Sequence, residues 1–429
     1  MLRLLRFRDF RLLWFGGLIS MIGDWALIAA LPYEVYQRTG SALATGAVFV
    51  AGVAPAILFG SAAGVFVDRY DRRRLMIWIN VALAISLVPL FGVDVVGIWV
   101  IYAVLFVGNI LEQAFIPAEV AMLPTLVGKE DLVAANSLSS LNRNLARLLG
   151  PAIGGAAIAF GGLTFVIVVD IASYVIAAVL IASIAPGASF RAAQVAADVV
   201  GDAVAIPASA LRRLATEWRS GIRVITSQPM LRAMFVFAGM TAIGEGFLVA
   251  LLVPWLTDIL HGDELAWAAI LSAQAVGGLI GALFVGRYLN KVAPAVLLGV
   301  GTLIFAVIDL AIFTYPLVLP IVLPAIIGMV IVGIPISAMG VGTTTLQQGL
   351  TTDSHRGRVV GTFQALWALG MVTGTLIAGV LSPTLGIIPM MALDSVIYFA
   401  GGVLILYTAG RVARRGETSG LAAPEGDPA

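Results

Sequence analysis

The sequence predicts an all-α integral membrane protein with twelve transmembrane helices, arranged as two pseudo-symmetric six-helix bundles around a central cavity. Hydrophobic residues make up 60% of the 429-residue chain and charged residues only 11%, and the mean hydropathy is +1.03. A soluble protein of this size cannot bury so much apolar surface, so the bilayer must act as its solvent. The apolar residues also recur in stretches of about 20, the length that crosses a bilayer as a helix.

The individual helices follow from these stretches and from the polar residues between them. Four arginines precede a first stretch that is too long for a cleaved signal peptide, so we expect it to be retained as a span. The predicted spans run over residues 10–36, 43–67, 74–93, 96–123, 140–161, 163–184, 229–258, 265–288, 293–314, 317–347, 357–382 and 386–409. They form an N-terminal bundle over residues 1–184 and a C-terminal bundle over residues 229–410.

A cytoplasmic linker over residues 185–228 separates the two bundles. Within it, residues 211–225 alternate arginines with apolar residues, a pattern typical of an amphipathic helix lying on the inner leaflet. A solvated linker without a helix is the alternative. Residues 411–429 are rich in Gly, Ala, Pro and acidic residues beyond Arg415, which predicts a disordered tail.

The basic residues predict the orientation in the membrane. With the N-terminus in the cytoplasm, every Lys and Arg except Arg38 lies in a cytoplasmic segment or at the cytoplasmic end of a span. The opposite orientation would violate the positive-inside rule at almost every loop. We therefore expect a multi-pass protein with both termini in the cytoplasm.

Several function classes lack the residues that they need. The chain has no cysteine and only two histidines, His261 and His355, both in predicted loops. This composition argues against disulfides, a thiolate or histidine metal site and a catalytic triad. There is no Gly-x-x-x-x-Gly-Lys phosphate loop, and the basic residues form no continuous face for nucleic acid. We expect no enzyme activity, metal, cofactor, nucleotide or nucleic acid.

The two halves share motifs at a nearly constant offset. Two matched sets carry the comparison: Ile22-Gly23-Asp24 with Ile243-Gly244-Glu245, and Asp170-x-x-x-Tyr174 with Asp394-x-x-x-Tyr398. Matches in the same order indicate duplication of a six-span unit. Such repeats bracket a site near the middle of the membrane and move about it.

Glycine pairs four residues apart occur on spans that the repeat makes equivalent. Glycine at this spacing leaves a flat strip where two helices approach closely. We expect helix packing, and sliding during opening and closing, at Gly60 with Gly64, Gly150 with Gly154 beside Pro151, Gly277 with Gly281, and Gly370 with Gly374.

The carboxylates inside predicted spans are the candidate coupling residues, because each costs about 3 kcal/mol to insert at a helix centre. Asp24 and Glu245 are the first choices, since each lies midway along its span and follows a glycine. Glu112 is a third candidate for a proton or a cation. A carboxyl group deprived of water holds its proton more tightly and can carry it across. Static hydrogen bonding between helices is the alternative.

Other buried charges have different interpretations. Glu119 lies at the depth of Arg143 and Arg147, which predicts a salt bridge that acts as a gate strut, or a purely structural ion pair. The matched acids Asp170 and Asp394 are placed near the outer ends of their spans, which favours packing or capping. Asp309 is isolated, and both interpretations stay open for it.

Aromatic side chains near the expected cavity could stack on a lipophilic or cationic substrate. They could equally pack against other helices or face lipid. These residues are Trp25, Phe106, Phe235, Phe247, Phe363 and Trp367.

The chain resembles the major facilitator superfamily in the loop between spans 2 and 3. Gly64-x-x-x-Asp68-Arg69-x-x-Arg72-Arg73 is similar to the superfamily's loop motif, except that Asp71 stands where Gly is usual. The resemblance implies a latch between the halves, formed by Asp68, Arg69, Arg72 and Arg73. A plain positive-inside anchor is the alternative.

Residues 7 to about 405 also resemble one branch of that superfamily. The Gly-Pro sequence at 150–155 is similar to the span 5 motif of drug:proton antiporters. The macrolide-efflux and enterobactin-exporter branch is resembled by three further motifs, Phe115-Ile-Pro117, Leu123-Pro124 and Ala135-Asn136-Ser137. The chain departs from antiporters in lacking an Arg in span 4. The resemblance implies multidrug-resistance-type efflux from a bacterial inner (plasma) membrane.

We therefore predict a secondary active transporter that exports amphipathic small molecules, such as drugs, macrolides or siderophore-like compounds, by alternating access and in exchange for protons. Its partners would be that substrate, protons and membrane lipids. A lysophospholipid or lipid flippase on the same fold is the alternative, with Glu119, Arg143 and Arg147 binding a headgroup. A membrane scaffold that transports nothing is a third possibility.

Overall fold

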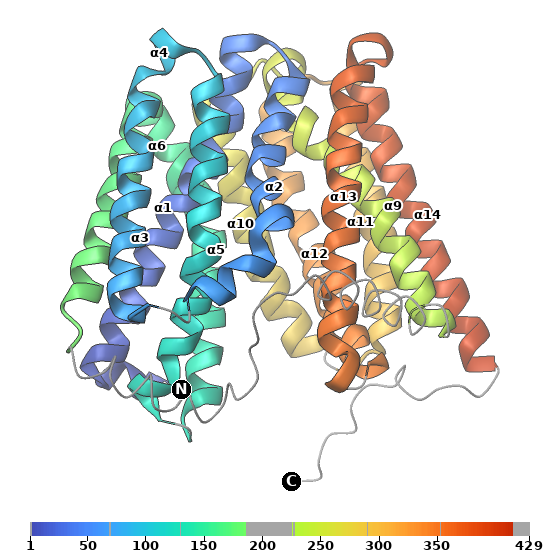
Figure 1. Cartoon of the computed structure of the whole chain (residues 1–429). Helices are drawn as coiled ribbons and strands as arrows, with labels where there is room; N and C mark the ends of the chain where they lie inside the picture. The colour runs from blue at the N-terminus through green and yellow to red at the C-terminus, as the bar shows by residue number, and fades with distance from the viewer. Residues whose placement is uncertain are drawn as a thin grey trace, which may run out of the picture. The chain divides into compact units, whose positions relative to one another are not determined.

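A computed structural model of the chain (Figure 1) describes residues 2–67, 70–128, 130–185, 225, 228–289, 291–351 and 353–414. Within these residues all regular structure is helical. The chain divides into two compact units, Met1–Thr39 with Ala47–Ala205, and Gly40–Gly46 with Ile206–Ala429. Four predictions fall outside the described residues: Asp68, Arg69, the linker helix up to residue 224, and the tail beyond Arg414. The side-chain surroundings of Gly60 and Gly64 also fall outside them.

The first unit contains five long helices and their extensions. They are α1 (Arg8–Thr39), which follows the 3-10 turn η1 (Leu2–Arg6), most of α2 (Ala42–Val67), α3 (Arg72–Leu87) with η2 (Val88–Gly92) and α4 (Val93–Val96), α5 (Trp99–Val127) and α6 (Leu132–Ala182). These bounds lie within a few residues of the predicted ones, except that α6 begins eight residues earlier than predicted.

The second unit contains six long helices. They are α9 (Pro229–Pro254) with the π-helical turn η3 (Trp255–Ile259), α10 (Glu264–Tyr288), α11 (Pro294–Thr314) with η4 (Tyr315–Leu317), α12 (Val322–Leu350), α13 (Asp353–Leu385) and α14 (Ile387–Arg414). Among the described residues of the whole chain, ten helices are long and apolar enough to cross a membrane.

Glycines at two connections allow the chain to reverse abruptly. The long helix α6 loses helical geometry at Gly161 and Gly162, and Gly162 has φ 64°. Gly386, with φ 88°, separates α13 from α14. A side chain in this left-handed region is strained, so glycine permits a connection of only one or two residues. The break in α6 lies where the sequence predicts the end of one span and the start of the next.

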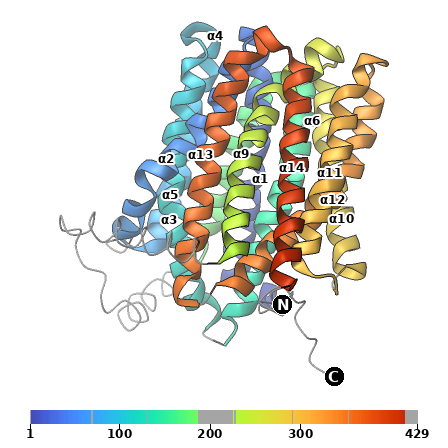
Figure 2. The ribbon, with the colours of Figure 1, turned by 90° about the vertical axis from the view of Figure 1, so that its right-hand side faces the viewer.

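Each unit has a central helix contact. In the first unit, α1 packs along α6, and in the second, α9 packs against both α13 and α14. Figure 2 shows α9 between α13 and α14. Glycines make these approaches close: a Cβ atom at Gly154 would lie 2.2 Å from the Ala26 carbonyl oxygen, and one at Gly374 would lie 2.0 Å from that of Ile243. Gly277 and Gly281 of α10 approach the backbone of α12 in the same way.

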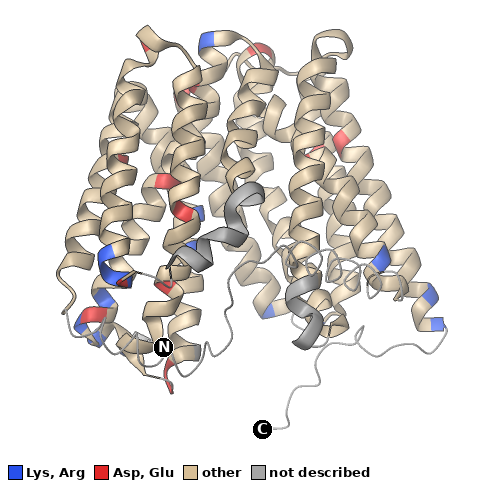
Figure 3. Cartoon of the chain, in the orientation of Figure 1, with Lys and Arg blue, Asp and Glu red and all other residues tan. Residues whose placement is uncertain are grey.

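Basic residues gather at one end of the helices in each unit (Figure 3). Arg38, at the opposite end of α1, is the exception that the sequence identifies. It lies 2.6 Å from a Glu34 carboxylate oxygen and 2.5 Å from one of Asp94. Two acids therefore balance this isolated cation.

Two buried polar contacts join α1 to α6. Trp14 Nε1 donates to the Leu138 carbonyl oxygen at 2.9 Å, and Asn142 Nδ2 donates to the Trp14 carbonyl oxygen at 2.9 Å. Asn142 is only 1% exposed. Burying a side-chain amide costs little free energy only while the amide keeps its hydrogen bond.

We expect Asn142→Ala to destabilise the first unit by about 1 kcal/mol, because it removes the hydrogen bond to α1. Thermal unfolding of the purified protein in detergent measures the effect. The exposed Asn144 lies two residues away on the same helix, so Asn144→Ala is the matched control. Equal unfolding temperatures for the two variants would contradict the stabilising role of this contact.

Candidate functional site

An acid and a tyrosine meet in the interior of the first unit. Asp24 lies at the middle of α1, and the Tyr174 hydroxyl of α6 donates a short hydrogen bond to its Oδ1 atom. Asp170, one helical turn before Tyr174, is fully buried at 0% exposure, and its Oδ2 atom has no hydrogen-bond partner among the residues that the structure describes. A Cβ atom at Gly23 would lie 2.3 Å from Asp170 Oδ1, so glycine makes room for this carboxyl group.

The second unit repeats this arrangement. The Tyr398 hydroxyl of α14 donates to Glu245 Oε2 of α9 at 3.1 Å. Asp394 is 1% exposed, and within the described part of the chain neither of its carboxyl oxygens has a hydrogen-bond partner. A Cβ atom at Gly244 would lie 2.0 Å from Asp394 Oδ1. In both units a glycine and an acid of one helix thus face an Asp-x-x-x-Tyr sequence of another.

A third acid joins each group, and here the units differ. Glu112 of α5 interacts electrostatically with Asp24. Asp309 of α11 interacts electrostatically with Glu245, and its Oδ2 atom accepts a 2.6 Å hydrogen bond from Ser395. We call the first group cluster 1 (Asp24, Glu112, Asp170, Tyr174) and the second cluster 2 (Glu245, Asp309, Asp394, Tyr398).

Within each cluster the acids differ in accessibility. Asp24, Glu112 and Glu245 are only partly buried, whereas Asp170, Asp309 and Asp394 are at most 4% exposed. Each cluster therefore combines at least one partly accessible acid with at least one fully buried acid, and these acids interact with one another. Like charges this close repel strongly where the surroundings are apolar, so the acids of a cluster do not ionise independently.

Sequence reasoning selected Asp24, Glu112 and Glu245 but assigned Asp170 and Asp394 to packing near the outer ends of their spans. The structure instead brings these two acids against the glycines that precede Asp24 and Glu245. The signal was present in the shared Asp-x-x-x-Tyr spacing, because a helix places residues four apart on the same face.

The predicted salt bridge of Glu119 is not formed in the structure. Among the described residues, no ion pair joins Glu119 to Arg143 or Arg147. Glu119 is 7% exposed and interacts with Arg143 only through longer-range electrostatics, while Arg143 donates to Ser140 Oγ at 2.9 Å. The Arg147 guanidinium lies 5.9 Å from the centre of the Trp25 ring. Helix spacing put these groups at one depth but did not fix which way the side chains turn.

The described part of the loop after α2 shows how the turn forms without glycine at 71. Asp71 caps α3 by accepting a 2.8 Å hydrogen bond from the Arg74 backbone N–H. Arg73 donates to the carbonyl oxygen of Ala182, the last residue of α6. A cation at a helix C-terminus is favourable because the carbonyl dipoles point toward it. Among the described residues, the buried Nε atoms of Arg72 and Arg73 have no hydrogen-bond partner.

Of the predicted cavity aromatics, five are half-buried and one is fully buried. Phe235 and Phe363 meet edge to face, with ring centres 5.7 Å apart, across α9 and α13. Phe247 is only 2% exposed, which leaves almost no surface for a substrate and corrects its prediction as a cavity residue. Trp25, Phe106 and Trp367 keep partial exposure.

Comparison with known proteins places this architecture among transporters. A family model described as transmembrane secretion effector matches residues 2–420. The multidrug efflux pump Tap of Mycolicibacterium fortuitum is 31% identical over 417 residues, which cover 90% of this chain and 94% of the pump. The macrolide efflux protein A of Streptococcus pyogenes is 28% identical over 177 residues, covering 40% of this chain and 44% of that protein.

Solved structures show the same fold at low sequence identity. A bacterial homologue of the human lysosomal transporter Spinster superposes with a TM-score of 0.65 at 15% identity, covering 97% of this chain and 99% of the homologue. A bacterial homologue of the iron transporter ferroportin gives a TM-score of 0.63 at 17% identity and covers 94% of this chain and 98% of its own. The chain is thus a multi-pass membrane protein that belongs to the transmembrane secretion effector family of the major facilitator superfamily.

Proposed function

We propose that this protein is a secondary active transporter that exports amphipathic small molecules, of the drug, macrolide or siderophore-like kind, in exchange for protons. The names of the relatives support export: one is a multidrug efflux pump and another a macrolide efflux protein. The observation that carries the proposal of proton exchange is the pair of buried acid clusters, one in each unit. Carboxyl groups in apolar surroundings are costly to keep without a use.

The proposed architecture is twelve spans in two six-helix halves that alternate access to a central site. Ten apolar helices support this count, together with α2 and with the break at Gly161–Gly162, which divides α6 into two spans. The matched contacts of clusters 1 and 2 support duplication. The basic ends of the helices support an orientation with both termini in the cytoplasm of a bacterial inner membrane.

In the proposed mechanism, the partly accessible acid of each cluster exchanges protons with the aqueous side that is open. A proton on Asp24 or Glu245 removes one negative charge from a group of interacting acids and so lowers their repulsion. The tyrosine hydroxyl holds each acid toward its buried neighbour. A cationic substrate would compete with the proton for the same negative charge, which is the basis of exchange.

The remaining candidates have supporting roles in this proposal. Arg72 and Arg73, with Asp68 and Arg69 before them, would latch the cytoplasmic side. Arg143, Arg147 and Glu119 would tune the potential near cluster 1 through space, since they form no direct ion pair. A substrate would stack on the partly exposed aromatic residues, which are Trp25, Phe106, Phe235, Phe363 and Trp367.

The decisive test is proton movement driven by substrate in proteoliposomes that contain the purified protein. A panel of macrolides, cationic dyes and siderophores is added, and internal pH is followed with a trapped dye. We expect proton flux with at least one compound, and about tenfold less with Glu245→Gln, because an amide of the same shape cannot bind a proton. A well-folded protein that moves no protons with any compound would exclude proton exchange and favour the lipid-flippase alternative.

A further inference from the structure

A groove of about 410 Å³ lies between the start of α9 and the end of α14, away from both acid clusters. Its nine lining residues come only from these two helices. Those that bear on binding are Arg232, Val236, Leu404, Tyr407, Thr408 and Arg411. The two helices run antiparallel, so the first turns of α9 and the last turns of α14 lie at the same end of the unit, where the basic residues gather.

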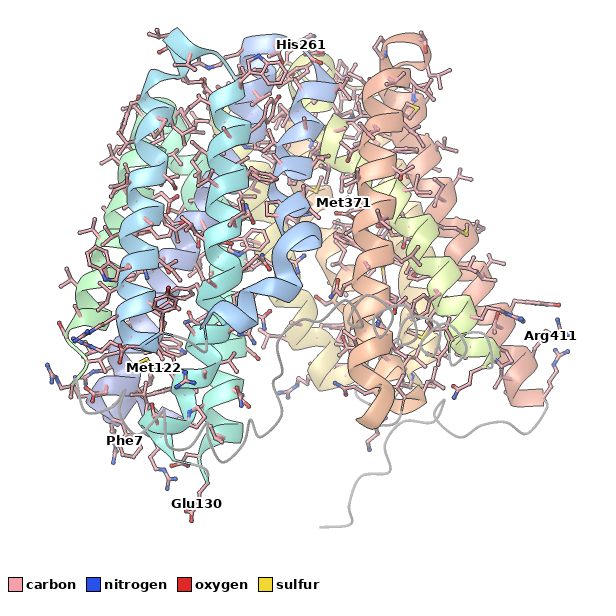
Figure 4. All side chains as sticks on the ribbon, viewed as in Figure 1. Phe7, Met122, Glu130, His261, Met371 and Arg411 are labelled. Carbon is pink, nitrogen blue, oxygen red and sulfur yellow. The ribbon has the colours of Figure 1, made fainter. Side chains whose placement is uncertain are left out.

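The polar part of the groove is positively charged, and its described lining residues include no acid. Arg232 and Arg411 are both exposed, and neither belongs to an ion pair among the described residues. The Arg411 guanidinium lies 5.7 Å from the Tyr407 ring centre, and its side chain extends outward from α14 (Figure 4). The Thr408 hydroxyl donates within its own helix, to the Leu404 carbonyl oxygen at 2.8 Å, so the two guanidinium groups supply the strong donors.

The apolar part lies deeper in the membrane. Val236 is one turn further along α9 than Arg232, and Leu404 is nearly two turns before Arg411 on α14, so both lie on the side of the membrane interior. Val236 is 48% exposed. The groove therefore offers guanidinium groups at the helix ends and an apolar wall above them, in the order in which a phospholipid presents its phosphate and its acyl chain.

We propose that this groove binds an anionic phospholipid from the leaflet on the side where α9 begins. Arginine matches the geometry of phosphate oxygens by donating two parallel hydrogen bonds. Two arginines without a carboxylate favour a headgroup of net negative charge over a zwitterionic one. A free phosphate ion would use the arginines but would leave the apolar wall uncovered.

The chain's own segments are weaker candidates for this groove. The predicted linker helix before α9 is rich in arginine, so it would add repulsion to Arg232 and Arg411. The tail after α14 carries Glu417, Glu425 and Asp427, which could pair with them, but it has no apolar run to cover Val236 and Leu404. A lipid satisfies both parts of the groove, and occupation by the tail becomes an outcome to test.

Native mass spectrometry of the full-length protein, titrated with phosphatidylglycerol and separately with phosphatidylcholine, tests the proposal. We expect the Arg232→Gln/Arg411→Gln variant to bind phosphatidylglycerol at least tenfold more weakly than the wild type. Val236→Trp, which fills the apolar part without changing charge, should weaken binding similarly. The matched control is Arg287→Gln/Lys291→Gln, which removes two exposed cations at the same end of the unit, outside the groove, and should bind normally.

Three results would overturn the proposal. Equal weakening by the control variant would indicate a general attraction of basic residues to anionic lipid. Displacement of the lipid by millimolar inorganic phosphate, with no effect of Val236→Trp, would indicate a site for a free anion. Lipid binding that appears only after truncation beyond Arg415 would make the tail the resident occupant. None of these results depends on transport, so the proposal stands or falls independently of the proposed function.

Discussion

Replacing Asp24 with Asn and Glu245 with Gln in one protein is expected to abolish uphill efflux. Both amides keep an oxygen that can accept the hydrogen bond from Tyr174 or Tyr398, so the helix contacts should survive. Neither amide can bind and release a proton, and an exchanger that carries no proton cannot use a proton gradient. In proteoliposomes with an imposed pH gradient, the substrate ratio across the membrane should fall to about one, the value for transport without coupling.

The double variant needs a control of equal chemical change. Asp258→Asn with Glu264→Gln alters two exposed acids of the second unit, in η3 and at the start of α10. This control should build the same substrate ratio as the wild type. Downhill exchange of labelled substrate should persist in both proteins, which separates loss of coupling from loss of folding. A double variant that still concentrates substrate would show that clusters 1 and 2 do not couple transport to protons.

Gly374→Ala is expected to destabilise the second unit by about 3 kcal/mol, at the upper end of the cost of overpacking a core. The new Cβ atom would lie 2.0 Å from the Ile243 carbonyl oxygen and 2.9 Å from the Ile243 Cα atom. Both obstacles belong to the backbone of α9, so no side-chain rotation relieves the overlap. The helices α9 and α13 must separate, and the contact that holds Gly244 and Glu245 in place loosens with them.

Gly361, on the same helix, provides the comparison. A Cβ atom there would meet nothing within 4 Å, so Gly361→Ala should be neutral or stabilising by about 0.5–1 kcal/mol, because alanine favours the helix. Unfolding midpoints in detergent and the yield of folded protein report both variants. Similar midpoints for the two would mean that the α9–α13 contact tolerates a wider separation than the structure shows.

Hydropathy places most of the helices because a bilayer sets a minimum length for an apolar span. The ends agree best where a proline begins a helix, as at Pro229, or a glycine separates two helices, as at Gly386. Agreement was poorer at the start of α6, which begins eight residues before the predicted span, at Leu132. The helix extends through residues 132–139 because that segment contains no proline or glycine to break it.

The candidate site could be predicted only in part. Asp24 and Glu245 were identifiable because a mid-span carboxylate is rare and the two match across the halves. The approach of Asp170 and Asp394 to the glycines beside these acids could not be identified from the sequence. A residue's position along a span gives its depth in the membrane but not the neighbour that its side chain faces. That neighbour depends on Gly23 and Gly244, whose missing Cβ atoms admit the carboxyl groups. The prediction of a Glu119 salt bridge was wrong for the same reason.

The short glycine connections have a consequence for enzymes that act on the membrane surface. At the ends of the helices remote from the basic residues, the described connections are Gly40–Ser41, Gly97–Ile98, Gly161–Gly162, Leu260–Asp263, Val318–Ile321 and Gly386. A protease must draw an extended segment of several residues into its cleft. These turns supply no such segment, so we expect a protease confined to that side of intact cells to leave the chain uncut.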